Sequence, residues 1–197
     1  MRTALLTTGA LLVSLSAVAG AQAAHAAGHP GPDQRATRQP TGDAALVANA
    51  LSAAPPAVAK AASVVGHDGR ELRRGTNGWV CMPDMPDVPN NTPMCLDAAW
   101  RAFIDAWMNK RSPNVTQVGF GYMLQGDMPV SNVDPFATGP TSTNQWIQHG
   151  GPHVMVLVPD ARVLDGISSD PTHGGPFVMW KGTPYAHIMV PTTAAPK

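Results

Sequence analysis

One segment near the middle of the chain has the clearest helical pattern. Its apolar side chains recur at helical spacing, and they are Leu96, Trp100, Phe103, Ile104 and Trp107. This spacing predicts an amphipathic helix over residues 93–109, with Thr92 as its N-cap and Pro93 as its first residue. Because such a helix buries one face, it needs a large apolar partner, and that need constrains the whole fold.

A sheet is the expected partner. Four downstream segments are rich in β-branched, aromatic and other apolar residues, and they span 118–124, 153–158, 177–180 and 186–190. Three upstream segments, separated by turn signals, predict a β-meander at 63–65, 71–73 and 79–81. Two short helices are expected before them, at 44–51 and 57–62. The sequence thus predicts a single α+β domain over residues 42–192, with a mostly antiparallel sheet that carries the long amphipathic helix on one face.

Both ends of the chain carry features of their own. Arg2 precedes an uncharged apolar stretch over residues 4–19, and A-x-A cleavage patterns follow at residues 21–23 and 24–26. This arrangement predicts a secretory signal peptide over residues 1–26, and a periplasmic or secreted protein that has no membrane attachment after cleavage. Residues 27–41 hold almost nothing apolar to bury, so they predict a disordered linker, and residues 193–197 are expected to form a tail.

The charge balance narrows the function classes. Lys plus Arg and Asp plus Glu both number 13, so no basic excess is present to bind nucleic-acid phosphates. No P-loop, dinucleotide-binding fingerprint or nucleophile elbow occurs, so no cofactor is predicted. Ten methionines would suit a soft metal such as Cu(I). Core filling is the favoured interpretation for five of them, namely Met108, Met123, Met155, Met179 and Met189. Nothing in the sequence indicates an oligomeric state.

The only two cysteines, Cys81 and Cys95, flank a proline-rich loop. In an oxidising compartment such a pair most often forms a disulfide. The bond would close a loop of about 15 residues, contribute about 3 kcal/mol, and join the end of a strand to the first turn of the long helix. The alternative is a reactive Cys95 whose thiol pKa is lowered by the N-terminus of that helix, but no C-x-x-C spacing supports it.

Histidines gather in the C-terminal part of the chain. His153 and His187 each begin an H-[V/I]-M-V run within an expected strand. If those strands are neighbours, the two imidazoles could approach each other, and Asp127 or Asp134 from the connection over residues 125–152 could join them. The spacing matches no established metal motif, so ordinary hydrogen bonds on strands are expected, and a metal at His153 and His187 is the less favoured alternative.

The connection over residues 125–152 is longer than most loops of compact domains, and such loops are often functional. Trp146 lies within it, while Trp180 and Tyr185 flank a short hairpin connection. Aromatic side chains beside glycine and asparagine often wall pockets for small molecules. The predicted ligand-binding residues are therefore His153, His187, Trp146, Trp180, Tyr185, Asp127 and Asp134.

Several longer motifs occur in order along the chain. They are GTNGWVC at residues 75–81, PMCLD at 93–97, YMLQGD at 122–127, GPH at 151–153 and MWKGTPYAHIMVP at 179–191. In these motifs the chain resembles a set of exported bacterial proteins of unknown function. The resemblance covers most of the chain after about residue 44. It implies a bacterial periplasmic or secreted setting and supports Cys81 and Cys95 as one structural unit, but it implies no activity, cofactor or substrate.

Three functions stay open on the sequence alone. The first is a small-molecule binding or accessory domain with its site among the long connection, the hairpin tip and the two strand histidines. The second is an exported hydrolase that uses His153 or His187 as base and Asp127 or Asp134 as orienting acid. The third is a structural envelope protein without a ligand. A shared cavity lined by these side chains favours the first two functions, and histidines in a dry core favour the third.

Overall fold

The computed structural model describes residues 41–192 of the chain. The expected signal peptide over residues 1–26, all but the last residue of the expected linker, and the expected tail over residues 193–197 lie outside the described residues. No helix between residues 41 and 192 has the length and apolar character needed to cross a bilayer.

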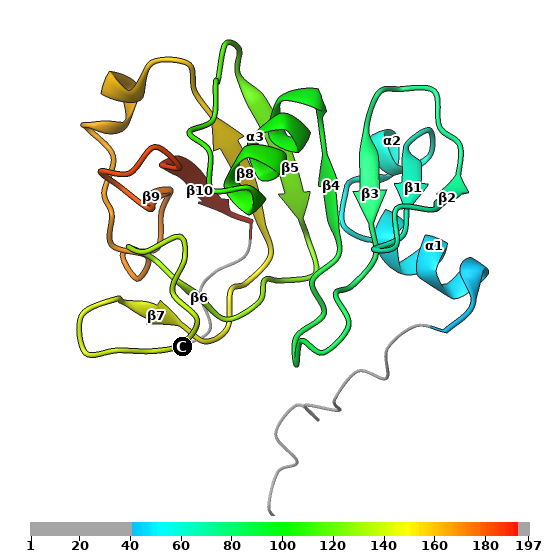
Figure 1. Cartoon of the computed structure of the whole chain (residues 1–197), viewed down its shortest axis with the longest axis horizontal. Coiled ribbons are helices and arrows are strands. Elements are labelled where there is room, and N and C mark those ends of the chain that lie inside the picture. The colour runs from blue at the N-terminus through cyan, green and yellow to red at the C-terminus, as the bar shows by residue number, and fades with distance from the viewer. Residues whose placement is uncertain (1–40, 193–197) are drawn as a thin grey trace, which may run out of the picture. The chain divides into compact units, whose positions relative to one another are not determined.

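An eight-stranded sheet forms the centre of the described fold, in the order β2-β1-β3-β4-β5-β8-β10-β9 (Figure 1). Its strands are β1 (Ser63–Val65), β2 (Glu71–Arg73), β3 (Val80–Met82), β4 (Met94–Leu96), β5 (Gly119–Met123), β8 (His153–Leu157), β9 (Phe177–Met179) and β10 (His187–Pro191). A short 3-10 helix, η1 (Ala161–Leu164), follows β8. All neighbouring strands are antiparallel except β1 and β3. The prediction of an α+β fold with a mostly antiparallel sheet is confirmed.

The expected meander over residues 63–81 forms differently. β3 pairs in parallel with β1, on the side away from β2. The chain crosses the start of β1 at Gly75, where a Cβ would lie 2.2 Å from backbone atoms of Ala62 and Ser63. Thr76 N continues this crossing by donating to Ala61 O (2.8 Å). Because glycine permits this close approach of two backbone segments, the chain can cross over after β2. β3 therefore pairs with β1, and the expected meander, in which β3 would pair with β2, does not form.

The central helix begins later than expected. α3 spans Ala98–Met108, and the segment before it is strand β4. Strand pairing prevails there because β4 lies between β3 and β5 and pairs with both. Asp97 is the N-cap, since its carboxylate accepts from Trp100 N (2.9 Å) and from Phe120 N (2.6 Å). The predicted helix start at Pro93 and the predicted N-cap at Thr92 are therefore wrong.

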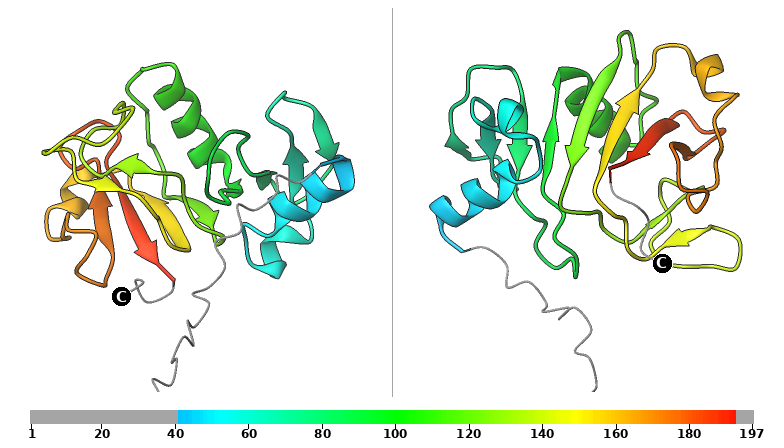
Figure 2. Two further views of the ribbon diagram at one scale, coloured as in Figure 1. Left: turned by 90° about the horizontal axis from the view of Figure 1, so that it is seen from below. Right: turned by 180° about the vertical axis from the view of Figure 1, so that it is seen from behind.

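α3 packs on one face of the sheet, and two short helices pack on the other (Figure 2). Trp100 on α3 lies over the sheet, with its Nε1 donating to Met155 O (3.2 Å). Gly121 leaves room for this packing, because a Cβ there would lie 2.8 Å from Met155 Cε. On the opposite face, α1 (Asp43–Leu51) and α2 (Pro56–Ala59) form a second apolar cluster with β1, β3 and β4. The expected short N-terminal helices are present.

The face opposite α3 is open further along the sheet. Two rows of apolar side chains cross β5, β8 and β10 there, namely Phe120, Val156 and Ile188, then Tyr122, Val154 and Val190. Phe120 is 42% exposed, and the others are half-buried. α1 and α2 do not extend over these rows (Figure 2). The core of this part of the sheet therefore lies on the α3 side.

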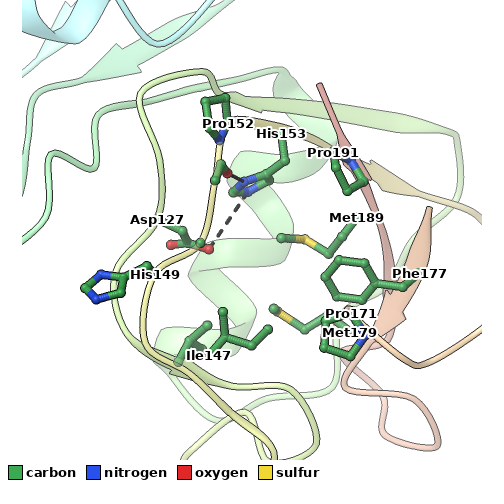
Figure 3. Close-up of a pocket in the computed structure, with 13 residues that line it drawn as sticks. Asp127, Ile147, His149, Pro152, His153, Pro171, Phe177, Met179, Met189 and Pro191 are labelled. Atoms are coloured by element: carbon green, nitrogen blue, oxygen red, sulfur yellow. Dashed lines mark hydrogen bonds and ion pairs between the residues drawn. The ribbon is translucent and has the colours of Figure 1, made fainter. Parts of the chain in front are cut away.

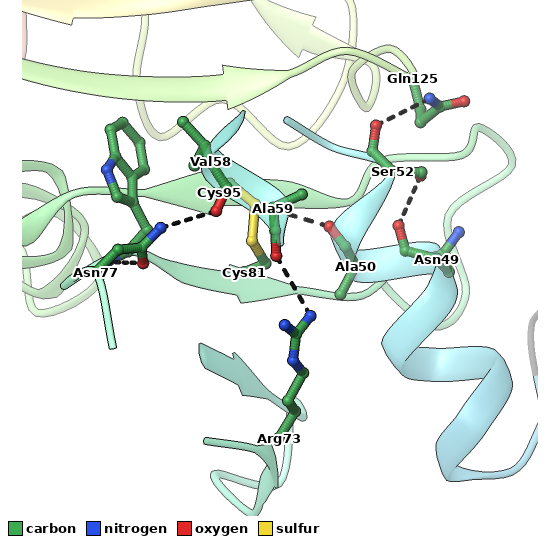
Figure 4. The surroundings of a disulfide bond; sticks show 11 residues. Asn49, Ala50, Ser52, Val58, Ala59, Arg73, Asn77, Cys81, Cys95 and Gln125 are labelled. Carbon is green, nitrogen blue, oxygen red and sulfur yellow. Dashed lines mark hydrogen bonds between the residues drawn. A yellow bond between two sulfur atoms is a disulfide. The ribbon is translucent and has the colours of Figure 1, made fainter. Parts of the chain in front are cut away.

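A disulfide joins Cys81 on β3 to Cys95 on β4, directly opposite each other in the ladder (Figure 4). Both residues are fully buried. The predicted bond is confirmed, but it does not reach a helix, because Cys95 lies on a strand. The bond also contradicts the alternative of a reactive Cys95 thiol. Beside it, Asn77 Nδ2 donates to Val58 O (2.8 Å), which ties the α2 region to the sheet.

The long connection over residues 125–152 folds back on itself. Its two halves pair as β6 (Val130–Ser131) and β7 (Trp146–Ile147). Ser131 Oγ donates to Asn144 O (2.8 Å), and Asn132 Nδ2 donates to Gln145 Oε1 (2.7 Å). The connection is thus an ordered, hydrogen-bonded unit that can position side chains.

Candidate functional site

The candidate site lies where the long connection returns to the sheet. Asp127 N donates to Gly150 O (2.9 Å), and this isolated bridge closes the connection just before β8 begins at His153. A Cβ at Gly150 would lie 2.6 Å from Asp127 Cβ, so the bridge requires glycine there. As a result the Asp127 side chain lies against the His153 ring.

Asp127 and His153 form a buried pair of a carboxyl group and an imidazole (Figure 3). Asp127 Oδ2 lies 3.8 Å from His153 Nε2, which is too far for a direct hydrogen bond. His153 is 3% exposed, and its Nδ1 lies 2.7 Å from Gly151 O. Because a carbonyl oxygen only accepts, Nδ1 carries a hydrogen, and Nε2 of the neutral ring then has only a lone pair. Within residues 41–192, Nε2 has no hydrogen-bond partner.

The Asp127 carboxyl group is only partly satisfied. Its Oδ1 accepts from Met128 N (2.7 Å), while Oδ2 faces His153. Burial raises the pKa of Asp127, and the electrostatic interaction with His153 and the hydrogen bond from Met128 N oppose that rise. When the carboxyl group is ionised and the imidazole is neutral, Oδ2 and Nε2 are two acceptors side by side.

A pocket of about 110 Å³ adjoins this pair. Most of its wall is apolar. The apolar side chains are Val130, Ile147, Pro152, Pro171, Phe177, Met179, Met189 and Pro191. Figure 3 shows the Met189 side chain directed toward Asp127 and His153. His149 lies at the pocket as well and is exposed. The pocket is therefore a mostly apolar hollow with one polar spot, as small-molecule sites usually are.

A second cavity of about 70 Å³ lies toward α3, with Trp100 and Trp107 of that helix in its wall. We call the first hollow the outer pocket and the second the inner cavity. The two cavities share Asp127, Val130, Met179 and Met189. Six of the ten methionines line the inner cavity, namely Met94, Met123, Met128, Met155, Met179 and Met189. Its tryptophans are Trp100, Trp107 and Trp180. Because methionine side chains are flexible and polarizable, these walls can adapt to ligands of different shape.

His187 lines the inner cavity only. Its ring packs edge-to-face against Trp100 and Trp180, with centroids 5.1 Å away in each case. Its Nδ1 lies 3.0 Å from Tyr185 O. Burial lowers the pKa of His187 to about 4, so the ring is neutral at pH 7.

The two histidines of the repeated H-[V/I]-M-V pattern are not brought together. β8 and β10 are neighbours as expected, but they run antiparallel, so His153 lies opposite Pro191 rather than His187. Antiparallel pairing reverses the second copy of the pattern and places the imidazoles at opposite ends of the strand pair. In the described part of the chain, no three or more His, Cys, Asp and Glu side chains cluster so as to hold a metal ion.

The other predicted site residues lie apart from the outer pocket. Trp180 and Tyr185 are buried in the core instead of forming an exposed hairpin tip, and Trp180 Nε1 donates to Ser131 O (2.8 Å). Trp146 lies on β7 and does not line the pocket. Asp134 is exposed, and its Oδ1 accepts from a backbone N–H within its own turn (2.9 Å). Of the seven predicted residues, only Asp127 and His153 share the outer pocket.

Sequence reasoning missed the apolar wall of the pocket. Met179 and Met189 were expected to fill the core, and they do, but they also border both cavities. One signal was available, because strand alternation places Met189 on the same face of β10 as His187. The same alternation places Met155 on the face of β8 that carries His153. The pattern therefore indicates a methionine-lined face but not the loop that closes over it.

No protein-family model, curated protein or solved structure matches this chain. Two neighbouring acceptors in an apolar hollow suit a ligand that donates hydrogen bonds. The lining of the outer pocket contains no Ser, Thr, Cys or Lys, so it offers no protein nucleophile of these types.

Proposed function

We propose that this protein is an exported, disulfide-bonded domain that binds a small, mostly apolar molecule in the pocket at Asp127 and His153. The observation that carries this proposal is the buried His153 Nε2, which has no hydrogen-bond partner among residues 41–192. A buried polar atom without a partner costs about 1 to 3 kcal/mol, and native proteins retain few of them. A ligand that donates to Nε2 would remove this cost.

Export is the second part of the proposal. It is supported by the leader-like pattern over residues 1–26 and by the Cys81–Cys95 bond, which suits an oxidising compartment. The motif resemblance supports a bacterial periplasmic or secreted setting. The intact mass of protein recovered from the periplasm or the medium tests this part, and we expect a chain that lacks its leader and has no free thiol. Recovery of the full chain from the cytoplasm alone would contradict it.

The geometry favours binding over hydrolysis. A carboxylate that orients a catalytic imidazole usually bonds to one ring nitrogen and leaves the other for the substrate. Here Gly151 O occupies Nδ1, and Asp127 lies 3.8 Å from Nε2, the atom that a substrate would need. Two adjoining cavities also fit a purely structural protein poorly, because ordinary cores are closely packed.

A panel of four-carbon compounds tests the proposal without knowledge of the natural ligand. 1-Butanol, n-butylamine and butyrate cover the neutral, cationic and anionic classes. At ten times its Kd, a ligand stabilises the folded protein by about 1.4 kcal/mol, which raises the Tm by about 3 °C for a chain of this size. We expect at least one compound to raise the Tm of the wild type.

Two tryptophan substitutions locate the effect. Ile147→Trp fills the outer pocket and should abolish the rise in Tm. Val163→Trp is the matched control, because Val163 is 55% exposed and lies outside both cavities. A panel without any effect, or an Ile147→Trp variant that responds like the wild type, would refute the proposed binding site.

A further inference from the structure

We propose that the ligand of this pocket is a primary ammonium compound with a single apolar tail. Its nitrogen would lie between Asp127 and His153, and its tail would enter the inner, methionine-lined cavity. This inference rests on the proposed function of the pocket as a binding site.

Hydrogen-bond complementarity points to the headgroup. When the carboxyl group of Asp127 is ionised and the His153 ring is neutral, Oδ2 and Nε2 both accept, because Gly151 O holds the single ring hydrogen on Nδ1. A nitrogen about 2.9 Å from each atom bridges their 3.8 Å separation at an angle of about 80°. An ammonium group has three donors and can give one hydrogen to each acceptor. A hydroxyl group has one donor, and a carboxylate has none.

The charge of the site also favours an ammonium headgroup. Asp127 is the one carboxyl group in the lining of either cavity, and neither lining contains Lys or Arg. Apolar walls make an isolated carboxylate costly, and removing it from water is the main cause that raises the pKa of Asp127. A bound ammonium ion would supply both the missing counter-charge and a charge-assisted hydrogen bond.

The inner cavity selects the rest of the molecule. Methionines and tryptophans form most of its wall, and His187 there is neutral at pH 7. A second ammonium group would find no second carboxylate, because Asp127 is already engaged. The cavity therefore suits a hydrocarbon or aromatic tail and disfavours a diamine.

Access to the acceptor requires a small movement. His153 Nε2 is covered by its neighbours, although His153 itself lines the outer pocket. Met189 points toward the pair in Figure 3 and belongs to both cavities. Its side chain has three rotatable bonds, so it can move aside at small cost and let a nitrogen reach Nε2.

A soft metal ion is the competing occupant, because thioether and imidazole ligands suit Cu(I). Such an ion would draw its remaining ligands from thioethers, since the described residues hold no cluster of three or more His, Cys, Asp and Glu side chains around a metal position. An ammonium group has donors for both acceptors, and its single charge balances the single carboxylate. Both features favour the organic cation over a metal ion.

Equilibrium titration at pH 7, followed by tryptophan fluorescence, compares n-butylamine, 1-butanol and 1,4-diaminobutane. We expect n-butylamine to bind at least about tenfold more tightly than the other two compounds, which is the ratio that one charge-assisted hydrogen bond supplies. Asp127→Asn keeps the side-chain size and an acceptor for Met128 N. This variant should raise the Kd of n-butylamine by at least about tenfold and change the Kd of 1-butanol by less than about twofold. The control variant Asp134→Asn removes an exposed carboxylate outside both cavities, and it should leave the Kd of both compounds unchanged.

The outcomes separate this inference from the proposed function. If 1-butanol binds as tightly as n-butylamine, or if Asp127→Asn leaves n-butylamine unaffected, the ammonium headgroup is refuted while the binding pocket stands. Equal binding of the diamine would refute the apolar tail. If none of these three compounds binds to the protein, and butyrate does not bind either, both proposals are refuted. Displacement of n-butylamine by stoichiometric Cu(I), added as its acetonitrile complex without oxygen, would identify a metal site and overturn the organic ligand.

Discussion

His153 Nε2 and Asp127 Oδ2 lie 3.8 Å apart beside a pocket whose wall is otherwise almost entirely apolar. The two residues meet because the Asp127–Gly150 bridge returns the long connection to the start of β8. His153 Nε2 has no hydrogen-bond partner among residues 41–192, and Asp127 Oδ2 faces it beyond hydrogen-bond distance. The arrangement is costly for the folded protein and favourable for a ligand with donors.

Asp127→Asn should stabilise the protein at neutral pH. Because burial raises the pKa of Asp127, the folded state binds more protons than the unfolded chain above the ordinary value of 3.8. The stability that this group contributes is present at low pH and is lost as the pH rises through the raised pKa. Thermal melts at about pH 4 and about pH 8 measure this effect, and the Tm advantage of the variant should be larger at the higher pH. An advantage that shrinks at the higher pH would contradict the raised pKa.

His187→Phe should make the protein less sensitive to acid. Burial lowers the pKa of His187 from 6.5 to about 4, so the unfolded chain takes up a proton that the folded protein excludes. The contribution of His187 is fully present above pH 6.5 and is lost as the pH falls toward about 4. Between pH 7 and pH 5 the wild type should lose about 2 kcal/mol more unfolding free energy than the variant. Denaturant titrations at the two pH values measure this difference, and equal losses would count against a neutral buried imidazole.

Loss of the disulfide should weaken the fold by about 3 kcal/mol, because the bond closes a loop with a sequence separation of 14 residues. The variant is the double substitution Cys81→Ala and Cys95→Ala, and urea unfolding measures the loss. Reduction of the wild type should produce a similar decrease in the urea midpoint. A midpoint that is unchanged by reduction would show that the bond does not support the fold.

Gly75→Ala should destabilise the protein by more than about 3 kcal/mol, since its Cβ would lie 2.2 Å from the backbone at the start of β1. Gly166→Ala is the control, because no atom lies within 4 Å of a Cβ at that position. The control should stay within about 0.5 kcal/mol of the wild type. Thermal unfolding compares the two variants. Equal stability would mean that the crossover between β2 and β3 does not need this close approach.

The strands after α3 could be predicted because local pattern and tertiary pairing agree there. The segment at Met94–Leu96 shows the opposite case. Leu96 fits the helical period of α3, yet the segment pairs with strands on both sides, and the helix begins only after the Asp97 cap. The periodicity of apolar residues carries no information about hydrogen bonds between distant strands, so it could not predict where the helix begins.

The candidate site could be predicted only in part, because it too depends on contacts between residues that are distant in the sequence. His153 and Asp127 were both expected, but Asp134 was an equal alternative to Asp127. The choice between them is made by the backbone bridge from Asp127 to Gly150, and no local pattern marks that contact. The burial of Trp180 was likewise unpredictable, because Trp180 N donates to Asn132 O in the long connection that folds over it (2.8 Å).

The most direct test of a small-molecule pocket at Asp127 and His153 is the NMR spectrum of the methionine methyl groups during titration with the tightest-binding compound of the panel. Met179 and Met189 line both cavities, whereas Met108 on α3 is 73% exposed and lines neither. The Cε resonances of Met179 and Met189 should shift saturably, with one common Kd, while that of Met108 stays in place. Saturable binding that leaves Met179 and Met189 unshifted would contradict a ligand in this pocket.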